Sequence, residues 1–172
     1  MYWADARMII DYGQFGDVVS FDTTYKINRA NRPFAVFVGL NRHRETVIFG
    51  AALMYDETID SFIWLFETFL KAMFGKAPKT MFIDQDAVMA KALSHVMPNT
   101  YYRLCTWHIM QNALKHVHGV FKGPGGVKKI LSKFMNEIEE QNEFFMAWNK
   151  ILNDYDMHEK SWMKSIFTIK EK

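Results

Sequence analysis

The sequence predicts a mixed α/β domain followed by an all-helical segment. Short apolar runs of strand length occur only before residue 105, and amphipathic helical patterns alternate with the later ones. After the glycine-rich run at 123–126, every apolar pattern has helical spacing. The 172 residues are 49% hydrophobic and 16% aromatic, which supplies a packed core and argues against disorder. We therefore expect the order β-β-β-α-β-α-β-α in residues 1–122 and helices in residues 123–172.

The first three elements are expected to be strands in a meander. Residues 17–22 form a mostly apolar run that ends in an acid, as a buried strand does. Residues 34–40 and 46–53 are two further apolar runs, and the four polar residues that separate them predict an antiparallel hairpin.

Helical spacing begins next. Apolar residues from Phe62 to Met73 recur at i, i+3, i+4, i+7, i+8 and i+11, with Thr58 or Asp60 available as the N-cap and Gly75 as the stop. Strands are then expected at 80–83 and 101–104, and helices at 86–96 and 106–118. Two later apolar stripes predict further helices: Val127, Ile130, Leu131, Phe134 and Ile138, then Phe144, Trp148, Leu152 and Tyr155.

Two acids, Asp22 and Asp84, follow apolar strands directly. Polar side chains at strand ends commonly line ligand sites, and these two would converge if their strands were neighbours. Paired carboxylates without a thiolate suit a hard cation such as Mg²⁺ or Mn²⁺, which can activate water for phosphodiester chemistry. The alternative is capping, because Asp84 and Asp86 both precede a predicted helix.

Cys105 and His108 form a second candidate, because on a helix they would share a face. A zinc site needs about four ligands, and Cys105 is the sole cysteine, so packing at the start of a helix is favoured over zinc binding. A single cysteine also excludes an intrachain disulfide and makes a reducing compartment the default.

Basic residues cluster in two places where they could contact DNA phosphates, although a solvated surface is the favoured explanation because Lys and Arg are ordinary surface residues. The candidates are Lys26, Arg29, Arg32, Lys128 and Lys129. The net charge is only +2, so global charge does not indicate a nucleic-acid binder. No apolar run is long enough to predict a membrane span.

A family resemblance enters at these residues. Residues 15–25, which read FGDVVSFDTTY, resemble the first catalytic block of Mutator-like element (MULE) transposases, and most of all the plant far-red-impaired-response branch. Further blocks resemble this branch in the same order, at 32–41, 48–53, 61–66, 83–89 and 103–109.

The resemblance implies an RNase H-like core with a helical insertion after the second of three metal-holding acids. Asp22 matches the first acid and Asp84 the second, and Asp86 matches another acid of the same block and is the third candidate metal ligand. Cys105 and His108 match a Cys-x-x-His element that packs or orients near the active site. The third acid, a glutamate in a Ser-Glu-Ser-like block, has no match before Lys172.

These departures limit what the resemblance implies. Ile83 stands where the branch usually has threonine, and the glutamates at 137–143 lie inside the expected insertion. The family's upstream zinc-type DNA-binding domain and its downstream Cys/His motif have no match here, so zinc is expected only in those domains. We expect a fragment or a truncated product whose core is incomplete at the C-terminus. Its uncovered sheet face should promote self-association.

The resemblance leaves three functions open. The first is a domesticated transposase-derived domain in a nuclear transcription regulator, without catalysis. The second is a DNA transposase core with metal-dependent strand cleavage and transfer. The third is a protein–protein interaction module that forms homodimers or heterodimers with family members. DNA would be bound through the missing domains or weakly by this chain, and no membrane partner is expected.

Overall fold

The computed structural model describes residues 1–24, 28–117, 126–138 and 140–169, without the side chains of 126–128 and 135–136. Two compact units can be distinguished, Met1–Cys105 and Thr106–Lys172. The predicted boundary after residue 122 lies outside the described residues. Helix α4, which the prediction grouped with the first part, belongs to the second unit.

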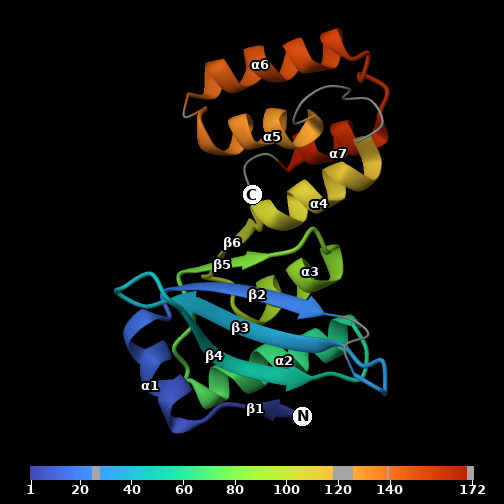
Figure 1. Ribbon diagram of the computed structural model, residues 1–172. Helices are drawn as coiled ribbons and strands as arrows, with labels where there is room; N and C mark the ends of the chain where they lie inside the picture. Colours follow the sequence, from blue (N-terminus) through green and yellow to red (C-terminus); the bar gives the residue numbers. More distant parts are fainter. Residues whose placement is uncertain (25–27, 118–125, 139, 170–172) are drawn as a thin grey trace. The chain divides into compact units, whose positions relative to one another are not determined.

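The first unit is built on one six-stranded mixed sheet with the order β1-β4-β3-β2-β5-β6 (Figure 1). Its strands are β1 (Tyr2–Trp3), β2 (Val18–Thr24), β3 (Phe34–Leu40), β4 (Thr46–Leu53), β5 (Thr80–Ile83) and β6 (Tyr101–Leu104). Strands β2, β3 and β4 form the predicted antiparallel meander, whereas β2, β5 and β6 run parallel. The strand predictions from residue 17 onward are confirmed.

Three helices belong to this unit: α1 (Ala6–Phe15), α2 (Ile59–Ala72) and α3 (Ala87–Val96). The ends of α2 illustrate how local residues set the bounds of these helices. The Thr58 hydroxyl accepts a hydrogen bond from the Ser61 amide at the start of α2. Gly75 ends this helix with a positive φ of 78°, and its amide donates to the Leu70 carbonyl. Both features were predicted.

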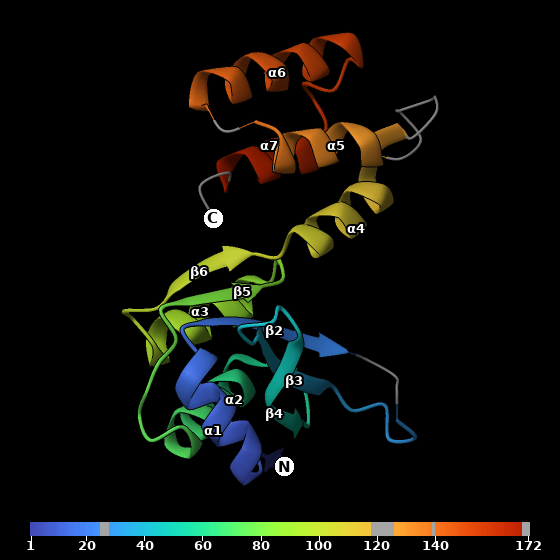
Figure 2. The same ribbon diagram turned by 60° about the vertical axis from the view of Figure 1, so that its left-hand side comes forward.

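The core of the first unit lies between the sheet and these helices (Figure 2). Phenylalanine rings from the strands meet rings from α2, and Phe37 stacks on Phe69 with a centroid distance of 4.1 Å. Phe21 packs edge-on against Phe66 at 5.1 Å. All four side chains are fully buried, so this aromatic layer makes a large hydrophobic contribution to the unit.

Strand β1 and helix α1 were not predicted. Tyr12 is the one fully buried residue of α1, and Ile9 and Phe15 on the same face pack against the core, so the sequence held a short apolar stripe that was missed. The Tyr12 ring packs edge-on against Phe49 and Phe69, and its hydroxyl donates to the Lys76 carbonyl at 2.8 Å. Strand β1 is only two residues long and pairs with β4.

Residues on the other face of the sheet alternate with the buried ones. Val18, Leu40 and Ile48 expose 50%, 58% and 46% of their surface. Because the helices of the first unit pack on the opposite face, this unit leaves an apolar sheet face uncovered by its own described elements.

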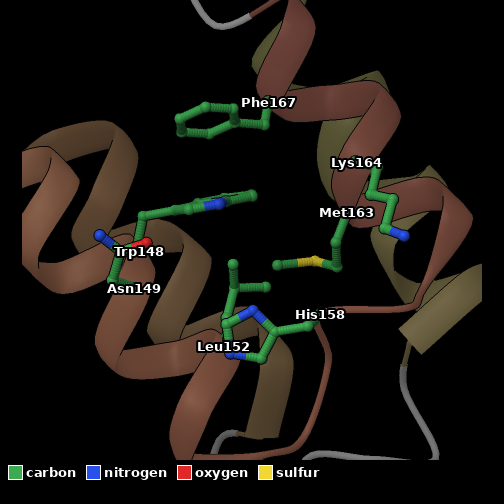
Figure 3. A pocket seen from close by; sticks show the side chains of 7 residues that line it. All are labelled: Trp148, Asn149, Leu152, His158, Met163, Lys164 and Phe167. Atoms are coloured by element: carbon green, nitrogen blue, oxygen red, sulfur yellow. The ribbon is translucent and has the colours of Figure 1, made fainter.

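The second unit is helical, as predicted. It contains α4 (Thr106–Val117), α5 (Gly126–Asn136), α6 (Gln141–Asp154) and α7 (Ser161–Thr168). A separate core forms here, with Leu131 and Trp148 from the two predicted stripes beside Trp162 and Met163 of α7. Figure 3 shows a small pocket at this core, with the Phe167 ring above the Trp148 indole and Met163 below it. None of the described helices in either unit has the length and apolar character that crossing a membrane requires.

Candidate functional site

The two strands that carry the predicted acids are neighbours. Strands β2 and β5 pair in parallel, with Val18 opposite Thr80 and Ser20 opposite Phe82. The same register, continued along both strands, places Asp22 level with Asp84, which directly follows β5. Adjacent strands are about 4.8 Å apart, so this register brings the two backbone positions together at the carboxyl ends of β2 and β5, which we call the sheet edge.

The acids of the second block have different local roles. Asp84 Oδ1 accepts a hydrogen bond from the Gln85 amide at 2.6 Å. Asp86 Oδ1 accepts from the amides of Val88 and Met89 at 2.7 and 3.1 Å, and Asp86 is the N-cap of α3. The capping alternative is therefore confirmed for Asp86, whereas Asp84 lies two residues before the N-cap position of this helix.

Two more carboxylates, at Asp56 and Glu57, were missed by the sequence analysis. Glu57 Oε1 accepts a 2.6 Å hydrogen bond from the hydroxyl of Thr23, the residue after Asp22. This bond ties the end of β2 to the segment that leads into α2. It joins residues far apart in sequence, so no local pattern could reveal it.

Asp56 organises the start of α2. Its Oδ1 accepts from the Thr58 amide and hydroxyl and from the Ser61 hydroxyl. These hydrogen bonds, led by the one from Ser61, lower the pKa of the Asp56 carboxyl. The signal for this role is present in the sequence, because an Asp two residues before a Thr cap is typical of a helix start.

The described carboxylates do not complete a three-ligand metal centre. Across the residues that the structure describes, no three His, Cys, Asp or Glu side chains lie close enough together to hold an ion. The sheet edge thus offers at most a paired arrangement of Asp22 and Asp84, and the prediction of a metal there stays a prediction.

Cys105 and His108 lie on the two sides of the division between the units. Cys105 precedes α4, and its amide donates to the Ile83 carbonyl, which extends the β5–β6 ladder by one residue. His108 lies in the first turn of α4, with its ring edge-on to Trp107 at 4.7 Å. Their predicted role near the active site stays a prediction.

The basic residues predicted to contact DNA differ in their exposure and in their contacts. Arg29 is exposed, and the Arg32 guanidinium lies over the Tyr55 ring at 5.2 Å from its centroid. Lys129 is exposed on α5. Lys26 and the side chain of Lys128 lie outside the described residues, so a phosphate-binding role for this set also stays a prediction.

Comparison with known proteins gives consistent matches. The family model described as the MULE transposase domain matches residues 18–112, which include both strand-end acids. Protein FAR1-RELATED SEQUENCE 5 of Arabidopsis thaliana is 37% identical over 168 residues, which is 98% of this chain and 21% of that protein.

Two further Arabidopsis thaliana proteins show the same pattern. FAR1-RELATED SEQUENCE 7 is 35% identical across 100% of this chain and 22% of its own length. FAR-RED IMPAIRED RESPONSE 1 is 35% identical across 95% of this chain and 20% of its own length. The chain therefore spans about a fifth of the length of these relatives, and the similarity includes both the sheet and the helical unit.

Proposed function

The chain belongs to the MULE transposase domain family, and we propose on this basis that it is a domesticated, transposase-derived domain of a nuclear transcription regulator. One observation carries the proposal: 35–37% identity runs through nearly the whole chain to FAR-RED IMPAIRED RESPONSE 1 and to two proteins named FAR1-RELATED SEQUENCE. In this proposal the domain does not catalyse transposition, and DNA is bound chiefly by other parts of the complete protein.

The proposal includes an RNase H-like architecture for the first unit. What supports it is the order of the strands, in which an antiparallel meander of β2, β3 and β4 is followed by β5 and β6, parallel on the free side of β2. The strand-end acids then occupy the edge where this arrangement gathers ligands.

The donor set fits weak binding of a hard cation better than catalysis. Two carboxylates on neighbouring strand ends provide the anionic oxygens that Mg²⁺ or Mn²⁺ requires. Such an ion would supply charge neutralisation at a phosphate and a more acidic bound water. For this chain, Asp22 and Asp84 would hold the ion, while the Thr23–Glu57 hydrogen bond steadies the end of β2. A third carboxylate is absent from this group within the described residues.

The alternative function is an active transposase core, which the description of the matching family as a transposase domain suggests. One experiment separates the two. The complete protein that carries this chain is expressed in plant cells with a transcription reporter and with a reporter for transposon excision, as wild type and as the Asp22→Asn, Asp84→Asn double variant.

A domesticated regulator changes reporter transcription equally in both forms and excises nothing. Excision by the wild type that disappears in the double variant would establish the transposase alternative instead. An unresponsive transcription reporter, with both forms shown to be nuclear and of equal abundance, would contradict the regulator.

A further inference from the structure

The hydrogen bond between Thr23 and Glu57 lies directly beside Asp22, one of the two strand-end acids. Thr23 is the next residue of β2, and its hydroxyl donates to Glu57 Oε1 at 2.6 Å. Glu57 is an exposed residue of the segment before α2, 34 positions further along the chain. The bond therefore ties the carboxyl end of β2 to the start of α2, in addition to the hydrogen bonds of the sheet.

The end of β2 receives support from the sheet on one side. The ladder between β2 and β5 ends at Ser20, whereas the ladder between β2 and β3 continues as far as Thr24. Asp22 and Thr23 thus lie beyond the last residue that β5 pairs, and β3 is their neighbour in the sheet. A strand end with fewer contacts opens more readily than the middle of a sheet, so an additional tie matters more there.

Alternation along β2 separates the side chains of Asp22 and Thr23. Phe21 is fully buried in the core on the α2 side, and Thr23, two residues later, has the same orientation. Asp22 lies between them and points to the opposite face of the sheet. Glu57 contacts β2 on the Thr23 side, and the described carboxylates form no group of three that could hold an ion. Its contact therefore fixes the backbone beside Asp22 without adding a ligand.

Glu57 is attached to a segment that is itself anchored. The preceding residue, Asp56, accepts hydrogen bonds from the amide and hydroxyl of Thr58 and from the hydroxyl of Ser61. The Met54 amide donates to the Pro33 carbonyl at 2.9 Å. Anchored residues thus flank Glu57 on both sides, so its carboxylate provides a fixed support for the end of β2.

We propose that Glu57 is a positioning residue for the cation site at the sheet edge, where it acts through the Thr23 hydroxyl to hold Asp22 in register with Asp84. The proposal rests on the proposed function, in which these two acids bind a hard cation. Residues that orient metal ligands without touching the metal contribute to its affinity. Loss of the Thr23–Glu57 hydrogen bond should therefore weaken cation binding although both ligands remain.

The test measures the Mn²⁺ affinity of the whole chain by calorimetry. Thr23→Val and Glu57→Ala should each weaken binding about fivefold, because either change removes the hydrogen bond. Glu57→Gln should keep an affinity close to that of the wild type, since the amide oxygen still accepts from the Thr23 hydroxyl. The double variant Thr23→Val, Glu57→Ala should bind no more weakly than either single variant, because both act through one bond.

Glu45→Ala is the matched control. Glu45 is also an exposed glutamate that accepts a side-chain hydrogen bond, from Asn41 Nδ2 at 2.9 Å. It lies in the turn between β3 and β4, at the opposite end of the sheet from Asp22. Its replacement removes the same charge and should leave the Mn²⁺ affinity unchanged.

Three results would overturn the proposal. Mn²⁺ binding that Asp22→Asn weakens but Thr23→Val and Glu57→Ala leave unchanged would remove the positioning role while the cation site stands. Equal weakening by Glu57→Gln and Glu57→Ala would show that Glu57 acts through its charge instead. No Mn²⁺ binding by the wild type would overturn the cation site and the role of Glu57 together.

Discussion

Asp22, Asp84 and Asp86 show how one residue type takes different roles within a few positions. All three belong to motifs that resemble acidic catalytic blocks, but one carboxylate oxygen of Asp86 accepts hydrogen bonds from two backbone amides of α3. Only the register of β2 against β5 makes Asp22 and Asp84 a pair. The sequence suggested this pairing on the assumption that the two strands are neighbours. The Thr23–Glu57 hydrogen bond could be found only in the structure, because the two residues are far apart in sequence.

Mn²⁺ binding at the sheet edge is the first prediction at this scale. Asp22→Asn and Asp84→Asn should each weaken Mn²⁺ binding in calorimetry, because a hard cation needs anionic oxygens. Asp86→Asn should leave Mn²⁺ affinity and stability almost unchanged, since asparagine caps helices as well as aspartate does. Unchanged affinity in the Asp22 and Asp84 variants would show that neither acid is a ligand.

The buried hydroxyl of Tyr2 gives a second prediction. Within the described structure this oxygen is buried and has no hydrogen-bond partner, and burial raises the pKa of Tyr2 from 10.0 to about 12. Tyr2→Phe should therefore stabilise the chain at pH 7 by about 1 kcal/mol in urea unfolding, because an unsatisfied polar group is removed. Tyr101→Phe, at an exposed position, is the control and should change little.

Tyr2 should also make the free energy of unfolding depend on pH in the alkaline range. Because the folded pKa of Tyr2, about 12, lies above the unfolded value of 10.0, its ionisation favours the unfolded chain, so it costs no stability below pH 10 and lowers the unfolding free energy as the pH rises through 12. Tyr2→Phe should reduce the loss of unfolding free energy between pH 10 and pH 12. Burial raises the pKa of Tyr12 in the same direction, so part of the slope should remain. An identical slope in wild type and variant would contradict this account.

Whole elements followed from the sequence where their periodicity was visible. Strands β3, β4, β5 and β6 have the predicted bounds, because each is a compact apolar run between polar turns. Helix α2 was equally clear, with a cap, a six-residue apolar stripe and a glycine stop. Helix α1 was missed although Ile9, Tyr12 and Phe15 have helical spacing, and the contacts of Tyr12 with Phe49 and Lys76 could not be read from local sequence.

One glycine in α1 and one after α2 should respond in opposite ways to replacement by alanine. Gly13 lies inside α1 and Gly75 follows α2, and a Cβ atom at either position would meet nothing within 4 Å. Gly13→Ala should stabilise by about 0.5–1 kcal/mol, because alanine restricts the unfolded chain and favours a helix. Gly75→Ala should destabilise by about 1 kcal/mol, because φ there is +78°. Equal signs in urea unfolding would refute the backbone explanation.

For the whole molecule, the division into two units is the dominant feature. Each unit has its own core, one of phenylalanines on a sheet and one of tryptophans and methionines between helices. The sequence indicated this change of character after the glycine-rich run. The compact units, however, divide earlier, between Cys105 and Thr106. Side-chain packing of α4 with α5 decides this, and periodicity alone does not reveal which neighbour a helix prefers.

The uncovered sheet face leads to a prediction about association. Val18, Leu40 and Ile48 present apolar surface to solvent, so sedimentation velocity should show association that increases with concentration. The double variant Leu40→Thr, Ile48→Thr keeps strand propensity and should reduce this association. Phe74→Ser, which removes an 87% exposed ring after α2, is the control and should have little effect. A monodisperse wild-type monomer would contradict the prediction.

The parallel pairing of β2 with β5 also has a consequence for how the chain folds during synthesis. The meander can form as soon as β4 is available, because its contacts are local, but Val18 meets Thr80 only after α2 and the following turn have been made. Closing this long loop costs entropy that the local hairpins do not require. Until β5 pairs with it, β2 is an edge strand and Asp22 lies at its unpaired side. The pair of carboxylates, Asp22 and Asp84, should therefore be among the last features of the first unit to assemble.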